Sequence, residues 1–94
     1  MKGKDIEDAC NDIGAKMFFD QFTFTISFKD GKKLIYAICN VGKTTSQILD
    51  DVAKIIKNGG HGRIFSQTGE FLGYAPENAS IDAILIHVDL MLAT

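Results

Sequence analysis

The chain has 94 residues, of which 46% are apolar and 23% are charged, and its formal net charge is -2. These values are typical of one globular domain and exclude a disordered chain, so we expect residues 1–94 to form a single domain. A small negative charge disfavours nucleic-acid binding, which relies on clustered Lys and Arg, and the lack of a long apolar run disfavours a membrane span. We therefore expect a cytoplasmic protein that binds neither nucleic acid nor membrane.

The first predicted element is an amphipathic helix over residues 5–18. Its apolar residues recur at intervals of three and four positions and are Ile6, Ala9, Cys10, Ile13 and Met17. Residues at this spacing share one side of a helix, which leaves Asp5, Asp8 and Asp12 on the other side. We expect this acidic side to be solvated or, alternatively, to dock onto a basic partner.

Residues 22–41 have the alternation of two strands joined at Asp30-Gly31. Asp-Gly is typical of a two-residue hairpin turn, because both residues tolerate the positive φ of a type I′ turn. In the resulting register, one face is expected to cover the core and carries Phe22, Phe24, Ile26, Ile35 and Ala37. A three-residue turn would reverse the parity and exchange the two faces of the second strand.

By the same register, a second apolar group lies on the other face of this hairpin. It consists of Leu34, Tyr36 and Ile38. An uncovered apolar patch on a sheet indicates self-association or a binding partner, unless another segment covers it. We therefore take Leu34, Tyr36 and Ile38 as candidate partner-binding residues, with cover by the C-terminal segment as the alternative.

A second helix is predicted over residues 44–58. Thr44, Thr45 or Ser46 can cap its start. Its apolar stripe comprises Ile48, Leu49, Val52, Ile55 and Ile56. Two glycines follow Asn58 and end the helix.

The last third of the chain is predicted to hold a hairpin, over residues 63–67 and 70–75, and one further element. Residues 80–92 combine features of strand and helix, since Ser80 can cap a helix, but their β-branched content favours a strand. The predicted order is α-β-β-α-β-β-β. This order indicates an α+β fold in which two helices pack on one face of an antiparallel sheet of four to five strands.

The segment Gly42-Lys43-Thr44-Thr45 resembles the second half of the phosphate-binding loop of P-loop nucleotide hydrolases, because it lies between a predicted strand and a predicted helix. In that family, a glycine five residues before the second glycine helps the backbone to enclose the phosphates. Here this position is Ala37, inside a predicted strand. We therefore expect an ordinary strand-to-helix connection.

Residues 59–63 read Gly-Gly-His-Gly-Arg, so that three glycines surround His61 and precede Arg63. Such a loop can turn backbone amides inward and present His61 and Arg63 to an anion. The alternative function is therefore a domain that binds a small molecule, a phosphate or a nucleotide, and such a domain could be an enzyme. In this alternative, Lys43 or Tyr74 lies near the loop. The commoner interpretation of such glycines is that they only end the helix and lead into the next strand.

The cysteines and histidines show no metal-binding pattern. Cys10, Cys39, His61 and His87 lack the close spacing of zinc ligands. Each cysteine falls on the apolar side of a predicted element, so we expect both to be reduced core residues. The chain contains no Gly-x-Ser-x-Gly motif, so the sequence gives no indication of nucleophilic catalysis. It predicts no cofactor and favours a role other than catalysis.

Two features exceed what folding requires: the acidic side of the first helix and the half-apolar sheet face. They favour a small cytosolic protein-interaction module, either a homodimer or an inhibitor-like binder of another protein. Its expected partner is a protein or a second copy of the chain.

Overall fold

The computed structural model describes residues 1–92 as three helices and one five-stranded antiparallel sheet. The element order is α-β-β-β-α-β-β-α, which confirms the predicted α+β class. The elements are α1 (Gly3–Ile13), β1 (Lys16–Phe19), β2 (Thr23–Ser27), β3 (Lys33–Ala37), α2 (Thr45–Lys57), β4 (Arg63–Phe65), β5 (Phe71–Tyr74) and α3 (Ile81–Leu90). The strands lie side by side in chain order.

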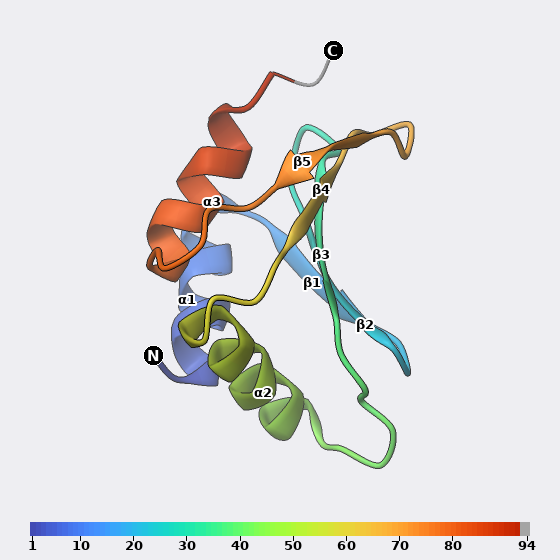
Figure 1. The fold of residues 1–94 in the computed structure, drawn as a ribbon, viewed down its shortest axis with the longest axis vertical. Coiled ribbons are helices and arrows are strands. Elements are labelled where there is room, and N and C mark those ends of the chain that lie inside the picture. The colour runs from blue at the N-terminus through green and yellow to red at the C-terminus, as the bar shows by residue number, and fades with distance from the viewer. Residues whose placement is uncertain (93–94) are drawn as a thin grey trace.

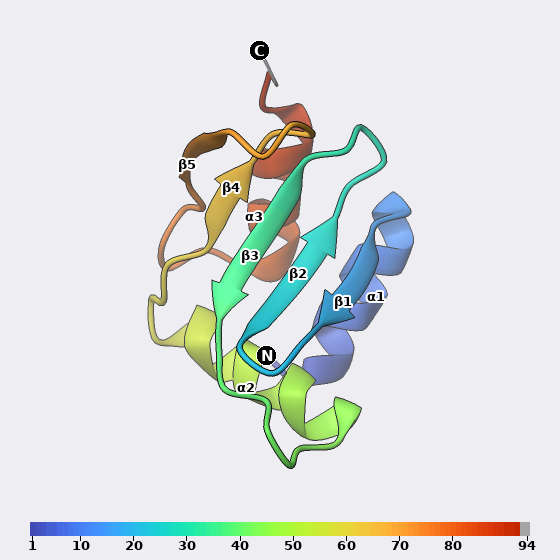
Figure 2. The same cartoon turned by 90° about the vertical axis from the view of Figure 1, so that its right-hand side faces the viewer.

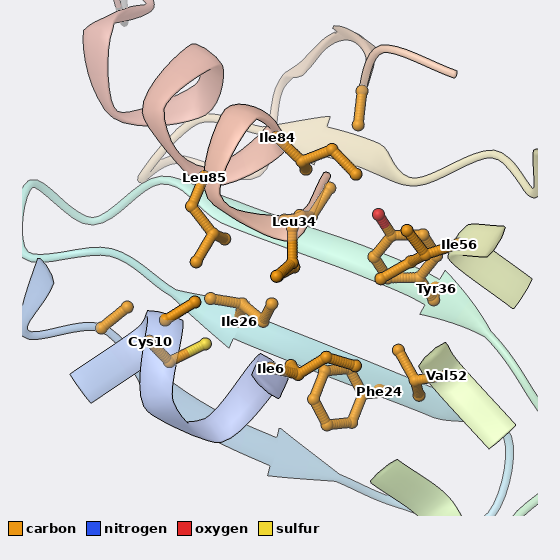
Figure 3. Close-up of a cluster of buried hydrophobic side chains, with 14 of the residues drawn as sticks. Ile6, Cys10, Phe24, Ile26, Leu34, Tyr36, Val52, Ile56, Ile84 and Leu85 are labelled. Atoms are coloured by element: carbon orange, nitrogen blue, oxygen red, sulfur yellow. The ribbon is translucent and has the colours of Figure 1, made fainter. Parts of the chain in front are cut away.

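The helices and the sheet form two layers with the core between them. All three helices lie on one face of the sheet (Figure 1), and none of these helices lies over the opposite face, which Figure 2 shows from the front. In the core, side chains of β2 and β3 meet side chains from each helix (Figure 3). The labelled core residues are Ile6, Cys10, Phe24, Ile26, Leu34, Tyr36, Val52, Ile56, Ile84 and Leu85.

α1 ends earlier than predicted, and a strand follows it. Gly14 adopts a left-handed backbone with φ 70°, and its N–H donates to a carbonyl of the last helical turn. This geometry ends a helix. The predicted helix over residues 5–18 therefore stops at Ile13, and residues 16–19 form β1 at the edge of the sheet. The spacing of Met17 continued the helical pattern and concealed this strand.

The turn between β2 and β3 contains three residues, 29–31, where the sequence predicted two. The N–H of Phe28 donates to the carbonyl of Lys32 at 2.9 Å, and Gly31 has a positive φ of 94°. A three-residue loop with glycine at the left-handed position is the next most common hairpin connection after the two-residue turns. The extra residue shifts the register by one and exchanges the faces of β3.

The expectation that Leu34, Tyr36 and Ile38 form an exposed patch is therefore wrong. Leu34 and Tyr36 are 0% and 1% exposed and lie in the core, and Ile38 packs against the core half-buried. Burial raises the pKa of Tyr36 to about 12. The residues predicted for the core that lie outside it are Phe22, Ile35 and Ala37.

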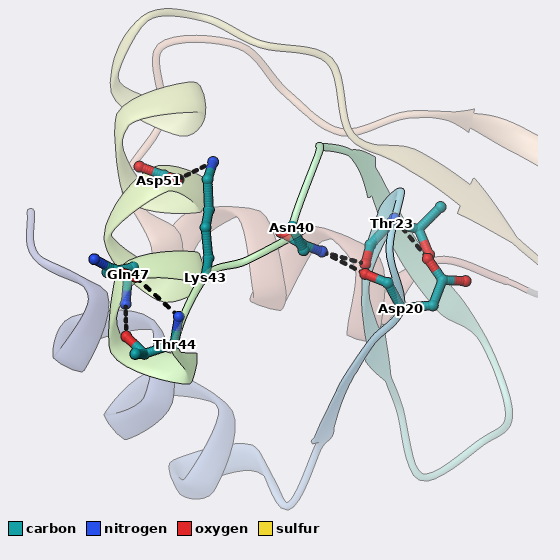
Figure 4. Close-up of polar contacts among 7 residues, drawn as sticks. All are labelled: Asp20, Thr23, Asn40, Lys43, Thr44, Gln47 and Asp51. Carbon is teal, nitrogen blue, oxygen red and sulfur yellow. Dashed lines mark hydrogen bonds and ion pairs between the residues drawn. The ribbon is translucent and has the colours of Figure 1, made fainter.

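α2 confirms its sequence prediction, and the second hairpin forms where it was predicted, but its strands are shorter than the predicted ranges 63–67 and 70–75. Thr44 caps α2, because its Oγ1 accepts the N–H of Gln47 at 3.3 Å while Gln47 Oε1 accepts the N–H of Thr44 at 2.9 Å (Figure 4). The hairpin of β4 and β5 turns through residues 67–69, and Gly69 has φ 87°. Its turn repeats the geometry of the first hairpin.

The last element is a helix, so the predicted strand over residues 80–92 is wrong. Ser80 Oγ accepts the N–H of Ala83 at 3.1 Å and caps α3. The buried side chains of α3 have helical spacing and are Ile81, Ile84, Leu85 and Val88. Packing of this apolar side against the core outweighs the strand propensity of β-branched residues.

A buried lysine, Lys32, donates a hydrogen bond to the chain at the C-terminal end of α3. The Nζ of Lys32 donates to the carbonyl of Met91 at 2.8 Å and forms an ion pair with Asp30. Desolvation by burial raises the pKa of Asp30, but the hydrogen bonds and charge of Lys32 outweigh this effect and leave that pKa below its ordinary value. This network joins the β2–β3 turn to α3.

Candidate functional site

The side of the sheet that points away from the helices faces the viewer in Figure 2. The strand registers place two rows of residues on this side, across all five strands. One row runs Phe18, Thr25, Ile35, Arg63 and Tyr74, and the next runs Lys16, Ser27, Lys33, Phe65 and Phe71. Directly paired residues of antiparallel strands share a face, and none of these ten is buried. We call these residues, together with the neighbouring Thr23, Ala37 and His61, the uncovered face.

Four rings of the uncovered face pack edge to face in an unbroken series, which we call the aromatic row. The ring centroids of Phe65 and Phe71 are 5.7 Å apart, those of Phe71 and Tyr74 are 5.3 Å apart, and those of Tyr74 and His61 are 5.4 Å apart. Edge-to-face packing at these separations is favourable. Phe71 and Tyr74 nevertheless remain 48% and 55% exposed.

A bulge in β5 places Phe71 and Tyr74 on the same face although three positions separate them. Phe71 pairs with Phe65 and Tyr74 pairs with Arg63, and the register shifts between these two pairs. Gly73 lies in this bulge with φ 142°. Regular alternation would send one of the two rings into the core. Sequence reasoning missed Phe18, Phe65 and Phe71, and the glycine inside a strand was the available signal for the bulge.

A depression of about 470 Å³ lies on the uncovered face next to the aromatic row. Its lining residues are Thr23, Ile35, Ala37, His61, Arg63, Phe65 and Tyr74. The lining thus combines aliphatic side chains with rings and a guanidinium. His61 Nδ1 lies 3.0 Å from Glu77 Oε1, which orients the imidazole at the rim. Three of the four residues of the predicted anion site, His61, Arg63 and Tyr74, therefore come together here.

The fourth residue of that predicted site, Lys43, does not line the depression. Its Nζ lies 2.6 Å from the Oδ2 of Asp51, in the middle of α2 (Figure 4). The Lys43 hydrogen bond holds the pKa of Asp51 below its ordinary value. Because the Thr44 and Gln47 pair already uses donors of the helix start, the loop has the ordinary capping role predicted for it.

The charges of the strands are all positive. Lys16, Lys33 and Arg63 are the only charged residues in β1–β5, and all 12 Asp and Glu residues lie outside the strands. Among residues 1–92, none of these three cations takes part in an ion pair or a side-chain hydrogen bond. The uncovered face is thus cationic on a chain whose net charge is -2.

The predicted acidic residues Asp5, Asp8 and Asp12 are exposed on α1, within the helix layer. They line a shallow hollow beside the start of α3. The helix layer covers the opposite side of the sheet from the aromatic row (Figure 1). The two candidate interaction features therefore lie on different sides of the molecule.

The two cysteines have different environments. Cys10 is buried in the core, where burial raises the pKa of its thiol to about 11, whereas Cys39 is exposed. The expectation that Cys39 is a core residue is wrong, because the shifted register removes it from the core side. His87 is exposed on α3, and over residues 1–92 no three His, Cys, Asp or Glu side chains gather as a metal site would require.

No protein-family model, curated protein or solved structure matches this chain. Among the helices of residues 1–92, none has the length and apolar character needed to cross a bilayer.

Proposed function

We propose that this chain is a small cytosolic protein-interaction module that binds another polypeptide through the uncovered face of its sheet. The observation that carries the proposal is the aromatic row, which stays exposed on a face that no described helix covers. Exposed aromatic side chains with an Arg nearby are typical of the energetically dominant residues of protein interfaces. An uncovered antiparallel sheet face is usually polar, so its rings exceed what folding needs.

A foreign partner suits this face better than a second copy of the chain. Face-to-face pairing of two copies would bring Lys16, Lys33 and Arg63 together with their own equivalents, and no strand carboxylate offsets them. Like charges in an interface are repulsive. We therefore expect light scattering to give the monomer mass of 10.3 kDa over a dilution series. A dimer that Phe71→Asp dissociates would instead make the second copy the occupant of the face.

Site-directed photo-crosslinking tests the proposal in living cells. A photoreactive phenylalanine analogue replaces Phe71 in one variant and Ile86 in another. Phe71 is 48% exposed on the sheet, and Ile86 is 54% exposed on α3 in the helix layer, so the two positions differ mainly in their side of the molecule. The proposal expects a discrete protein adduct from position 71 and none from position 86. Adducts from position 86 alone, or from neither position, would overturn it.

A second candidate function is the binding of a small anionic molecule in the depression. The observation that favours it is the convergence of His61, Arg63 and Tyr74 around one hollow. A ligand of the native state raises the melting temperature by mass action. This candidate expects a thermal shift with inorganic phosphate or a nucleotide panel, and loss of that shift in Arg63→Ala. No shift across the panel would count against it.

A further inference from the structure

We infer that the partner of the uncovered face presents an extended acidic segment, in which a carboxylate binds Arg63 and a nearby apolar side chain enters the depression. This inference rests on the proposed function and adds the chemistry of the partner to it.

The charge distribution is the first argument. The strands carry Lys16, Lys33 and Arg63 without any carboxylate among them, and these cations have no ion pair within residues 1–92. Charge complementarity steers partners to a surface and excludes those of like charge. A basic segment would meet three cations that have no ion-pair partner, whereas an acidic segment would neutralise them.

The position of Arg63 is the second argument. It pairs with Ile35 on one side and Tyr74 on the other, so its guanidinium lies beside an aliphatic residue and a ring at the border of the depression. A guanidinium is a planar fork of donors that fits a carboxylate through two parallel hydrogen bonds. The one carboxylate at the rim, Glu77, pairs with His61, and Arg63 itself makes no ion pair within residues 1–92. A carboxylate of the partner completes this geometry.

An extended segment can contact Arg63 and the depression together. Alternate side chains of an extended chain point to the same side, roughly 6.6 Å apart. One such pair can place an acidic side chain on Arg63 and an apolar side chain against Ile35 and Ala37 of the lining. The recognised pattern is therefore an acidic residue and an apolar residue two positions apart.

A single-stranded nucleic acid fits the same face less well. Base stacking needs ring faces that are open to the bases, but the four rings of the aromatic row pack edge to face against one another. Three strand cations on a chain of net charge -2 also give a weak attraction for a phosphate backbone.

Fluorescence anisotropy with three labelled peptide pools tests the inference. Each pool contains random 12-residue peptides of Leu, Phe, Ser and Gly, supplemented with Asp and Glu, with Asn and Gln, or with Lys and Arg. We expect the acidic pool to bind at least about tenfold more tightly than the neutral pool, and the basic pool not to bind. Arg63→Glu should remove most of the preference for the acidic pool, because a carboxylate then stands beside Lys16 and Lys33.

Two further variants keep this test specific. Lys57→Glu makes the same change of net charge on the exposed end of α2 and should leave the order of the pools unchanged. Arg63→Gln removes the charge without adding a carboxylate, so it should reduce the preference for the acidic pool over the neutral pool, while Lys16 and Lys33 retain part of it. Circular dichroism and the melting temperature verify that each variant is folded.

The outcomes separate this inference from the proposed function. Suppose that the acidic and neutral pools bind equally and that Phe71→Asp loses binding to both. This result would overturn the acidic partner but leave the uncovered face as a peptide-binding surface. An identical effect of Lys57→Glu and Arg63→Glu would overturn the role of Arg63. Binding of no pool, or tighter binding of a labelled 12-residue oligothymidylate than of the acidic pool, would also overturn the inference.

Discussion

Single aspartates stabilise the turns and loops of this fold by accepting hydrogen bonds that favour the charged carboxylate. The Oδ1 of Asp20 accepts the N–H of Phe22 at 2.9 Å, and it also accepts the N–H and hydroxyl of Thr23 (Figure 4). The backbone bond from Phe22 is the main cause of the lowered pKa of Asp20. Asp51 and Asp30 also have lowered pKa values, through Lys43 and Lys32.

These aspartates should make the protein less stable in acid. A carboxyl whose pKa falls on folding stabilises the native state above its unfolded value, here 3.8, and this contribution is lost as the pH falls through the lower folded pKa. We expect the urea midpoint to decrease between about pH 5 and about pH 2. Asp20→Asn should flatten that decrease.

Asp12→Asn is the matched control for this pH series. Asp12 is exposed on α1, and its side chain makes no hydrogen bond or ion pair among residues 1–92. Its variant should follow the wild-type pH profile. A profile for Asp20→Asn that also matches the wild type would show that the turn hydrogen bonds do not contribute to stability.

The two thiols should react at different rates. Burial raises the pKa of Cys10 to about 11 and shields its sulfur, whereas Cys39 is exposed. The thiolate is the reactive form. At about pH 8, we expect Ellman's reagent to label Cys39 rapidly in the native protein and Cys10 only after unfolding. Cys39→Ser should abolish the rapid phase, and rapid labelling of both thiols in the native protein would contradict the burial of Cys10.

At the level of elements, local signals determined which predictions were confirmed. α2 was predictable because a capping residue, an apolar stripe and terminal glycines all agree at its two ends. The register of β3 was not predictable, because Asp30-Gly31 fits both a two-residue turn and the end of a three-residue turn. α3 carries apolar residues on its exposed side as well, including Ile86 and Leu90, and this obscured its helical period.

The bulge in β5 provides a prediction at this scale. Gly73 has φ 142° and Gly42 has φ 74°, and an added Cβ would meet no atom within 4 Å at either position. Asparagine tolerates the left-handed region near Gly42 but not the conformation of Gly73. We expect Gly73→Asn to lower the free energy of unfolding by about 1–3 kcal/mol and Gly42→Asn to cost less, as measured by urea denaturation. Equal costs would contradict a bulge that requires glycine.

At the scale of the whole molecule, the layered arrangement decides which residues are available for binding. The glycines around His61 drew attention to His61 and Arg63, which are close in the chain, and the pairing of β4 with β5 brings Tyr74 beside Arg63. Whether Leu34 or Ile35 faces the helices depends on one residue in a turn, so the sequence pattern could not assign the exposed side. The cationic character of the uncovered face emerges only when five strands are aligned in register.

The affinity of the purified crosslinked partner, measured by isothermal titration calorimetry, tests the proposed binding face most directly. We expect Phe71→Asp to weaken binding at least about tenfold, or about 1.4 kcal/mol, because a buried interface ring becomes a charge. Ile86→Asp should bind as the wild type does, because α3 lies in the helix layer. Equal affinities for the wild type and Phe71→Asp, or a loss confined to Ile86→Asp, would contradict the assignment of the uncovered face as the binding surface.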